Sequence, residues 1–144
     1  MPNLHPFLTH FPIALLSVSI LCEWAAIALK HDELSRVGWW TQLGGTIGLA
    51  AAAGTGILAG NSVRIPAPGA EYFAMHQEIA FAASTAFAVL LFWRIGSGTK
   101  RPPGRDVLFL LIFAAGVLAI WGGAWYGGEM VYRFGVGVQA DGIR

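Results

Sequence analysis

Four apolar stretches, each long enough to cross a lipid bilayer, dominate the sequence and limit what the chain can fold into. They run over about residues 11–29, 37–60, 72–95 and 107–127. A helix of about 20 residues crosses a hydrocarbon core about 30 Å thick. Inside lipid every backbone polar group must be paired within the protein, which leaves helices and closed barrels as the possible spanning structures. We therefore predict four transmembrane helices.

The composition agrees with this prediction and leaves room for little else. Of the 144 residues, 56% are hydrophobic and 12% are charged, whereas about 25% of the residues of a soluble domain are charged. The segments between the stretches are short and rich in charged residues, Gly and Pro, as loops are. We expect an all-α fold with a single domain over residues 1–144, built as an integral membrane four-helix bundle with up-down-up-down topology.

The distribution of charge bears on partners and on orientation. The net charge is +1, and no basic run interleaves with aromatic residues, so nothing in the sequence indicates nucleic acid as a partner. If both termini lie outside, six Lys and Arg residues fall on the inner side and three on the outer side. The positive-inside rule favours that arrangement. We expect a multi-pass protein in a lipid bilayer with both termini on the outer side.

Small residues recur at helical spacing in the second and fourth stretches, for example at Gly44, Gly48 and Gly116. Such residues let helix backbones approach closely in lipid, where packing drives association. They predict a compact bundle, and they could also bind other membrane subunits or a second copy of the chain. The sequence shows no convincing tandem repeat, although the first and third stretches both begin with a histidine-bearing segment.

The histidines raise the question of function. His10 opens the first stretch and His76 opens the third, and because these two helices run in the same direction, both residues fall at the outer end of the bundle. His5 lies on that side too. His31 stands at the far end of the first helix, about 31 Å from His10 at about 1.5 Å per residue. We expect His31 to be an exposed loop residue.

Small side chains accompany each of the two outer histidines at spacings of four and seven residues. They are Ala14 and Ser17 after His10, and Ala80 and Ala83 after His76. Residues at these spacings share a helix face, so they could open a slot between facing helices. A flat macrocycle held by two imidazoles is one way to fill such a slot. The alternative is tight helix packing, with the histidines as hydrogen-bonding groups at the helix ends or the interface.

A site for zinc or another non-haem metal is a weaker alternative. The candidate outer ligands are His5, His10, His76, Glu71, Glu78 and Glu129, and no two of the histidines are four residues apart. A closed zinc site takes four ligands in tetrahedral geometry.

Glu23 is an ionisable residue inside the first stretch. A carboxylate there is costly unless it is paired or hydrated. Lys30 lies about two turns further on roughly the same face, and Arg94 lies at the same depth on the third helix. A structural ion pair is one interpretation of Glu23, and a carboxylate of a proton path or a quinone site is the other.

Two motifs mark the ends of the chain. HPFLTHFPIALL begins at His5 and GGEMVYRFGVGV begins at Gly127. Together they resemble a bacterial membrane family catalogued as domain of unknown function 2231, over essentially the whole chain. The resemblance implies four spans in the bacterial inner membrane and, because some members are joined to Rieske-type iron-sulfur domains, an electron-transfer partnership. Many members have a histidine where this chain has Phe134, so a ligand or proton role at that position would be absent here.

These observations lead to a functional hypothesis. We expect a membrane-embedded protein that holds one haem b near the outer leaflet through His10 and His76, and that passes electrons between membrane quinol and an outer-side redox protein. His5 would stand beside the site, as a hydrogen-bond partner or a substitute ligand. Such a chain is an electron carrier or a subunit of a redox complex rather than a stand-alone enzyme. The alternative is a cofactor-free structural subunit of a larger membrane complex, whose small-residue faces bind other helices.

Overall fold

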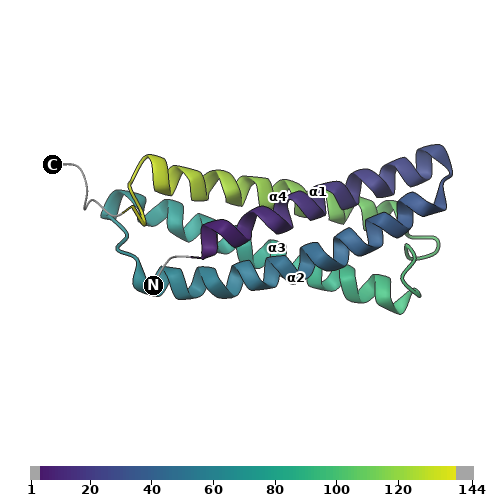
Figure 1. The fold of residues 1–144 in the computed structure, drawn as a ribbon, viewed down its shortest axis with the longest axis horizontal. Coiled ribbons are helices and arrows are strands. Elements are labelled where there is room, and N and C mark those ends of the chain that lie inside the picture. The colour runs from purple at the N-terminus through teal and green to yellow at the C-terminus, as the bar shows by residue number, and fades with distance from the viewer. Residues whose placement is uncertain (1–3, 139–144) are drawn as a thin grey trace.

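The computed structural model describes residues 4–138. Within them the chain forms four long helices, α1 (His5–Leu29), α2 (Asp32–Ser62), α3 (Ala70–Gly96) and α4 (Asp106–Tyr132), with a short 3-10 helix, η1 (Ala67–Gly69), in front of α3. Consecutive long helices run in opposite directions, so both ends of the described chain come to the same end of the bundle (Figure 1). All four are long and apolar enough to cross a membrane. The predicted all-α bundle is confirmed.

The helices extend beyond the predicted spans, and the first turns of two of them show why. α1 begins at His5 rather than near residue 11, because Pro6 stands in its first turn, where no helical partner for an N–H is needed. α2 begins at Asp32 rather than near residue 37. Its first turn carries two acidic residues, which interact favourably with the positive end of the helix dipole. The early start of α1 places His5 on a helix.

The start of α1 is recessed within the bundle. His5 contacts the backbone of Ala52 on α2, and α2 continues beyond that level to Ser62. At about 1.5 Å per residue, the extension of α2 is about 15 Å. Figure 1 shows the first turn of α1, in purple, well short of the left-hand end that the other helices reach. Beyond His5 the described chain therefore has three helices side by side instead of four.

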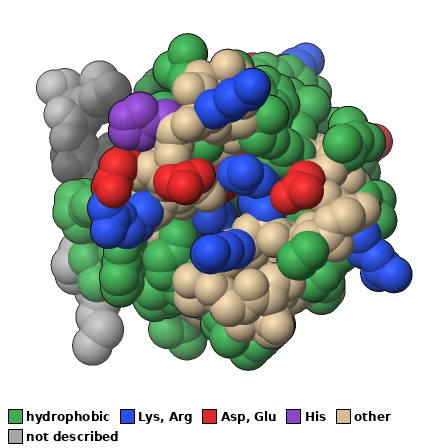
Figure 2. Space-filling model, turned by 90° about the vertical axis from the view of Figure 1, so that its right-hand side faces the viewer, with side chains coloured by type: hydrophobic (Ala, Val, Ile, Leu, Met, Phe, Trp, Pro, Cys, Tyr) green, Lys and Arg blue, Asp and Glu red, His purple; other side chains and the backbone are tan. Residues whose placement is uncertain are grey.

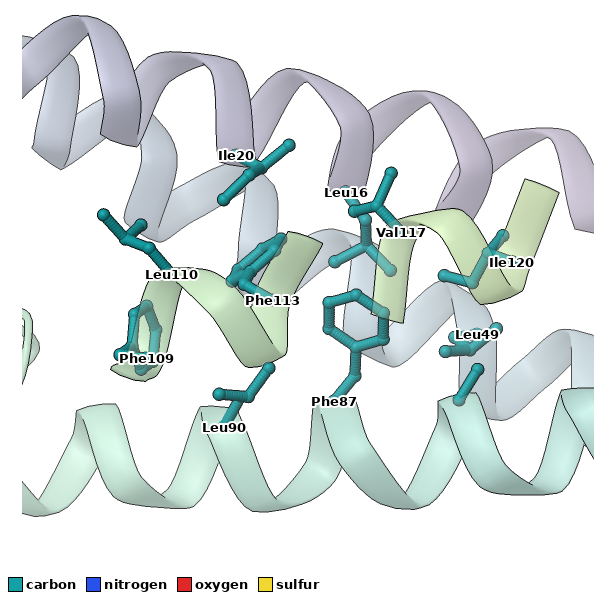
Figure 3. Close-up of a cluster of buried hydrophobic side chains, with 11 residues drawn as sticks. Leu16, Ile20, Leu49, Phe87, Leu90, Phe109, Leu110, Phe113, Val117 and Ile120 are labelled. Atoms are coloured by element: carbon teal, nitrogen blue, oxygen red, sulfur yellow. The ribbon is translucent and has the colours of Figure 1, made fainter. Parts of the chain in front are cut away.

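The core lies where the α1–α2 hairpin meets the α3–α4 hairpin (Figure 3). Phe87 and Phe113 pack edge to face, with ring centroids 5.1 Å apart. Phe87 also lies against Gly116, where an added Cβ would stand 2.9 Å from the ring. Large apolar side chains on the outside of the bundle, such as Phe92 and Val107, are 71% and 72% exposed. The outer surface is thus suited to lipid, and aromatic rings fill the space between the hairpins.

The second hairpin repeats the first at an interval of 71 residues, the interval that separates Glu23 from Arg94. Between α1 and α3, the buried residues Pro12, Leu16, Ser19 and Glu23 correspond to Ala83, Phe87, Leu90 and Arg94. Between α2 and α4, Gly38, Gln42, Gly45, Thr46, Leu49 and Ala52 correspond to Phe109, Phe113, Gly116, Val117, Ile120 and Gly123. The expectation of no internal repeat is therefore corrected. The repeat preserves which positions are buried, whereas most of the residues at those positions differ.

Candidate functional site

Two imidazoles meet at the recessed start of α1. His5 on α1 and His76 on α3 lie edge to face, with ring centroids 6.0 Å apart and planes at 84°. The Nδ1 of His5 donates a hydrogen bond to the carbonyl oxygen of Ala52 at 2.9 Å. The Nδ1 of His76 donates to the carbonyl oxygen of Gly123 at 2.8 Å. Donor and acceptor are 47 residues apart in both cases, so the two hairpins build the same contact.

These hydrogen bonds fix the tautomer of both rings. A backbone carbonyl can only accept, so Nδ1 must carry the proton, and in a neutral imidazole the lone pair is then on Nε2. Histidines that bind a metal usually show this arrangement, in which one nitrogen faces the metal and the other donates to a carbonyl or carboxylate. His5 and His76 are therefore held in the form that can act as metal ligands.

A glycine supports each imidazole one helical turn beyond the carbonyl that it contacts. A Cβ added at Gly56 would lie 2.9 Å from Cε1 of His5, and one added at Gly127 would lie 3.4 Å from Cε1 of His76. The two rings thus rest on the backbone of the neighbouring helix of their own hairpin. Any larger residue at Gly56 would push His5 out of place.

A cavity of about 710 Å³ surrounds the pair and is lined by residues of all four helices. Ligand pockets usually enclose about 300–1,000 Å³. The lining continues toward the middle of the bundle as far as Ser84, about 12 Å below the level of His76. Along α4 it continues outward as far as Tyr132, about 13 Å above the level of Gly123. The hydroxyl of Ser84 is buried and has no hydrogen-bond partner within residues 4–138. The walls are otherwise mostly apolar.

The structure brings together only some of the site residues that the sequence predicts. His5, His10, His76, Ala80 and Ala83 line the cavity, whereas Ala14 and Ser17 do not. Ser17 instead donates to the carbonyl oxygen of Ile13 and accepts a hydrogen bond from Nε1 of Trp121 at 3.0 Å. The slot beneath His10 that the spacing suggested is thus occupied by a helix contact.

The residue that faces His76 is His5 and not His10. His10 lies five residues further along α1, about 7.5 Å deeper in the bundle, where it is exposed and makes no hydrogen bond with the described residues. The difference arises because sequence reasoning began the helix near residue 11 and so made His10 its opening residue. At the 71-residue interval His5 corresponds to His76, and His10 corresponds to Phe81.

The residues missed by the sequence analysis contribute backbone rather than side chains. Ala52 and Gly123 supply carbonyl oxygens, and Gly56 and Gly127 supply space. The one signal in the sequence is the shared interval, because His5 with His76 and Gly56 with Gly127 are both 71 residues apart.

Larger metal-ligand sets are not formed in the part of the chain that the structure describes. No three of its His, Cys, Asp and Glu side chains stand close enough together to hold a metal ion. Glu129, one of the possible zinc ligands, lies 3.7 Å from Arg133 instead. The geometry offers a pair of imidazoles and not a tetrahedral set.

A second polar cluster lies at the opposite end of the bundle. The Glu23 carboxylate is fully buried and binds Arg94 at 2.5 Å and Arg101 at 2.6 Å. Arg94 also donates to the side-chain oxygen of Gln42 at 2.9 Å. Figure 2 shows this end of the molecule, with basic and acidic side chains gathered near its middle. Of the two interpretations of Glu23, the ion pair with Arg94 is confirmed, and Lys30 lies exposed outside it.

A family model with the description "Predicted membrane protein (DUF2231)" matches residues 1–140. The chain belongs to this family. No curated protein and no solved structure matches the chain. In this member of the family, the two end motifs noted in the sequence line the same cavity. The first contributes His5 and His10, and the second contributes Gly127, Met130 and Val136.

Phe134, in the second motif, packs at the rim of this region. Its ring centroid lies 5.0 Å from that of Tyr72, and its Cβ would be 3.3 Å from a Cβ added at Gly69. Phe134 therefore joins the C-terminal motif to the segment before α3. It supplies packing at this position.

Proposed function

We propose that this chain is a membrane-embedded b-type haem protein in which His5 and His76 would hold the haem iron. The observation that carries the proposal is the pair of imidazoles with Nδ1 bound to a carbonyl and ring centroids 6.0 Å apart. Two imidazoles that bind one metal atom through Nε2 at about 2.0 Å hold their ring centres about 6 Å apart. The ring centres thus already have the separation that a shared metal needs, and the edge-to-face rings would have to turn so that both Nε2 atoms face it.

The cavity around the pair suits a flat, mostly apolar macrocycle. It extends both above and below the level of the histidines, and its volume of about 710 Å³ lies within the range of cofactor pockets. Ala80 and Ala83 form part of its wall on α3, where larger side chains would close it. These residues fit a haem between the two hairpins.

The identity of the two ligands also supports the proposal. Glu23 and Arg94 occupy equivalent positions of the two hairpins, contact each other directly and carry opposite charges. At His5 and His76, and at the glycines that support them, the residues are the same. A bis-histidine haem site takes an imidazole from each side, whereas direct packing does not call for the same residue in both hairpins.

The proposed chemistry is electron transfer. A bound haem supplies a one-electron couple whose potential depends on its axial ligands, on hydrogen bonds to those ligands and on burial. In this chain the carbonyls of Ala52 and Gly123 hold the imidazole protons, and the apolar walls limit access of water. The site is at the same end of the bundle as both ends of the described chain. With the termini outside, in the bacterial inner membrane, it suits transfer between membrane quinol and an outer-side redox protein.

The test is a visible spectrum of protein purified from cells supplied with haem. We expect a reduced-minus-oxidised spectrum with the sharp α-band of a bis-histidine haem, lost in His5→Ala and in His76→Ala. His31→Ala is the control, because His31 is exposed at the opposite end of α1. Circular dichroism shows whether each variant is folded. A folded protein without haem would overturn the proposal and favour a structural subunit.

A further inference from the structure

We infer that His10 binds the polar ring of a quinone or quinol that reaches the cavity from the lipid. The first observation is position. His10 lines the same cavity as His5 and His76, yet it lies about 7.5 Å deeper along α1 and on the exposed side of the helix. It is therefore at the edge of the cavity and not at its centre.

The second observation is the cost of an imidazole at this depth. The buried Glu23 and Arg94 mark the polar end of the span opposite the site. Thirteen residues separate Glu23 from His10, about 20 Å along the helix, in a hydrocarbon layer about 30 Å thick. A polar side chain exposed to lipid there loses its hydrogen bonds to water, and such residues usually have a functional partner. His10 has no hydrogen bond to any described residue.

The third observation is the equivalent position in the other hairpin. Phe81 corresponds to His10 at the 71-residue interval, lines the same cavity and is 51% exposed. An apolar ring at this position of a hairpin is therefore compatible with the fold. Because packing does not require an imidazole, the nitrogen atoms of His10 are available for a ligand.

The chemistry of the position selects the class of ligand. An imidazole can accept a hydrogen bond from a hydroxyl group and donate one to a carbonyl group, and a quinol and a quinone present these two groups on one small ring. The walls of the cavity, including Ile13 on α1 and Ile57 on α2, are mostly apolar. A ligand with a polar ring and an apolar tail could thus place its ring at His10 and keep its tail in lipid.

The inference rests on the proposed function for the role of the ligand as electron donor, but binding can be measured separately. The probe is a benzoquinone with a decyl tail, titrated into the purified protein in lipid nanodiscs. Bound quinone is determined by its ultraviolet absorbance, and the haem spectrum is recorded on the same samples.

The deciding variant is His10→Phe, which gives the first hairpin the residue that the second already has. We expect it to weaken quinone binding at least tenfold and to leave the haem spectrum unchanged. His31→Phe, the same substitution at the opposite end of α1, should leave both unchanged.

Each outcome decides between the two proposals. Quinone affinity that is equal in His10→Phe and the unaltered chain would overturn the inference. Loss of the haem spectrum in His10→Phe would also overturn it, because His10 would then be a ligand of the metal. If no variant contains haem but quinone binding still depends on His10, the inference stands and the proposed haem site fails.

Discussion

Glu23 and Arg94 occupy equivalent positions in the two hairpins and form a buried ion pair with an N–O distance of 2.5 Å. If the two hairpins had identical sequences, the side chains at positions 23 and 94 would carry the same charge. Like charges repel strongly in a medium of low dielectric. The opposite charges avoid this and join the hairpins at one end of the bundle. At the other end the hairpins present the same residue, histidine, from both sides.

The ion pair makes the first prediction. Glu23→Ala leaves the guanidinium of Arg94 buried without its carboxylate, and removing one partner of a buried pair costs about 3 kcal/mol or more. We expect a lower free energy of unfolding by that amount when the purified protein is titrated with SDS in mixed micelles. Glu33→Ala removes an exposed partner of Arg36 and should have no measurable effect. Equal stability of the two variants would contradict a structural role for Glu23.

The fold was largely predictable from the sequence because hydropathy and length determine it. Four apolar stretches of about 20 residues can satisfy their backbone in lipid only as helices or as a closed barrel, and the lengths match helices. The location of His76 at the same end of the bundle as the start of α1 followed from helix direction alone. Helix starts were less predictable, since Pro6 extends α1 by more than a turn beyond the apolar stretch. That extension changes which histidine faces His76.

The internal repeat was difficult to predict, because it conserves burial at positions where most of the residues differ. Leu16 corresponds to Phe87 and Gln42 to Phe113, pairs with little chemical similarity. The carbonyl oxygens that the histidines contact belong to the backbone, so no residue type in the sequence identifies them. Only the packing of four helices shows which backbone atoms each imidazole contacts.

The glycine beneath His5 makes the second prediction. In Gly56→Ala the new Cβ would stand 2.9 Å from the imidazole, so the ring must move away from the carbonyl of Ala52. On the proposed function, we expect the haem-to-protein ratio to fall severalfold while the helix content is unchanged. Gly54→Ala is the matched control on the same helix, because nothing lies within 4 Å of its Cβ. If both variants bind equal haem, His5 is not held by this contact.

Chemical rescue gives a third prediction. His5→Gly removes the imidazole and leaves a space next to Gly56 that free imidazole can fill. We expect this variant to lose the spectrum of a low-spin haem and to regain it when imidazole is added at millimolar concentration. His31→Gly, treated in the same way, should show no change. A variant that keeps its low-spin spectrum without added imidazole would show that another residue is the ligand.

Close packing within the first hairpin makes a fourth prediction. A Cβ added at Gly45 would lie 2.6 Å from Cγ of Leu16, whereas one added at the neighbouring Gly44 would lie 3.5 Å from Leu15. Overpacking of a core typically costs about 1–3 kcal/mol. We expect Gly45→Ala to lower the free energy of unfolding by that amount and Gly44→Ala to change it little. Gly44 belongs to the small-residue stripe expected from the sequence, but it is its neighbour Gly45 that has no room for a methyl group.

The orientation of the bundle makes the last prediction. With both termini outside, the loop that contains Arg64 is outside and the loop that contains Lys100 is inside, where the excess of basic residues is expected. Cys22, the one cysteine of the sequence, is first replaced by serine so that only the introduced thiol can react. In this background, we expect Arg64→Cys to react with a membrane-impermeant maleimide in intact spheroplasts. Lys100→Cys should react only after the membrane is permeabilised. The reverse pattern would place the histidine pair on the inner side, and electron exchange with an outer-side redox protein would then be impossible.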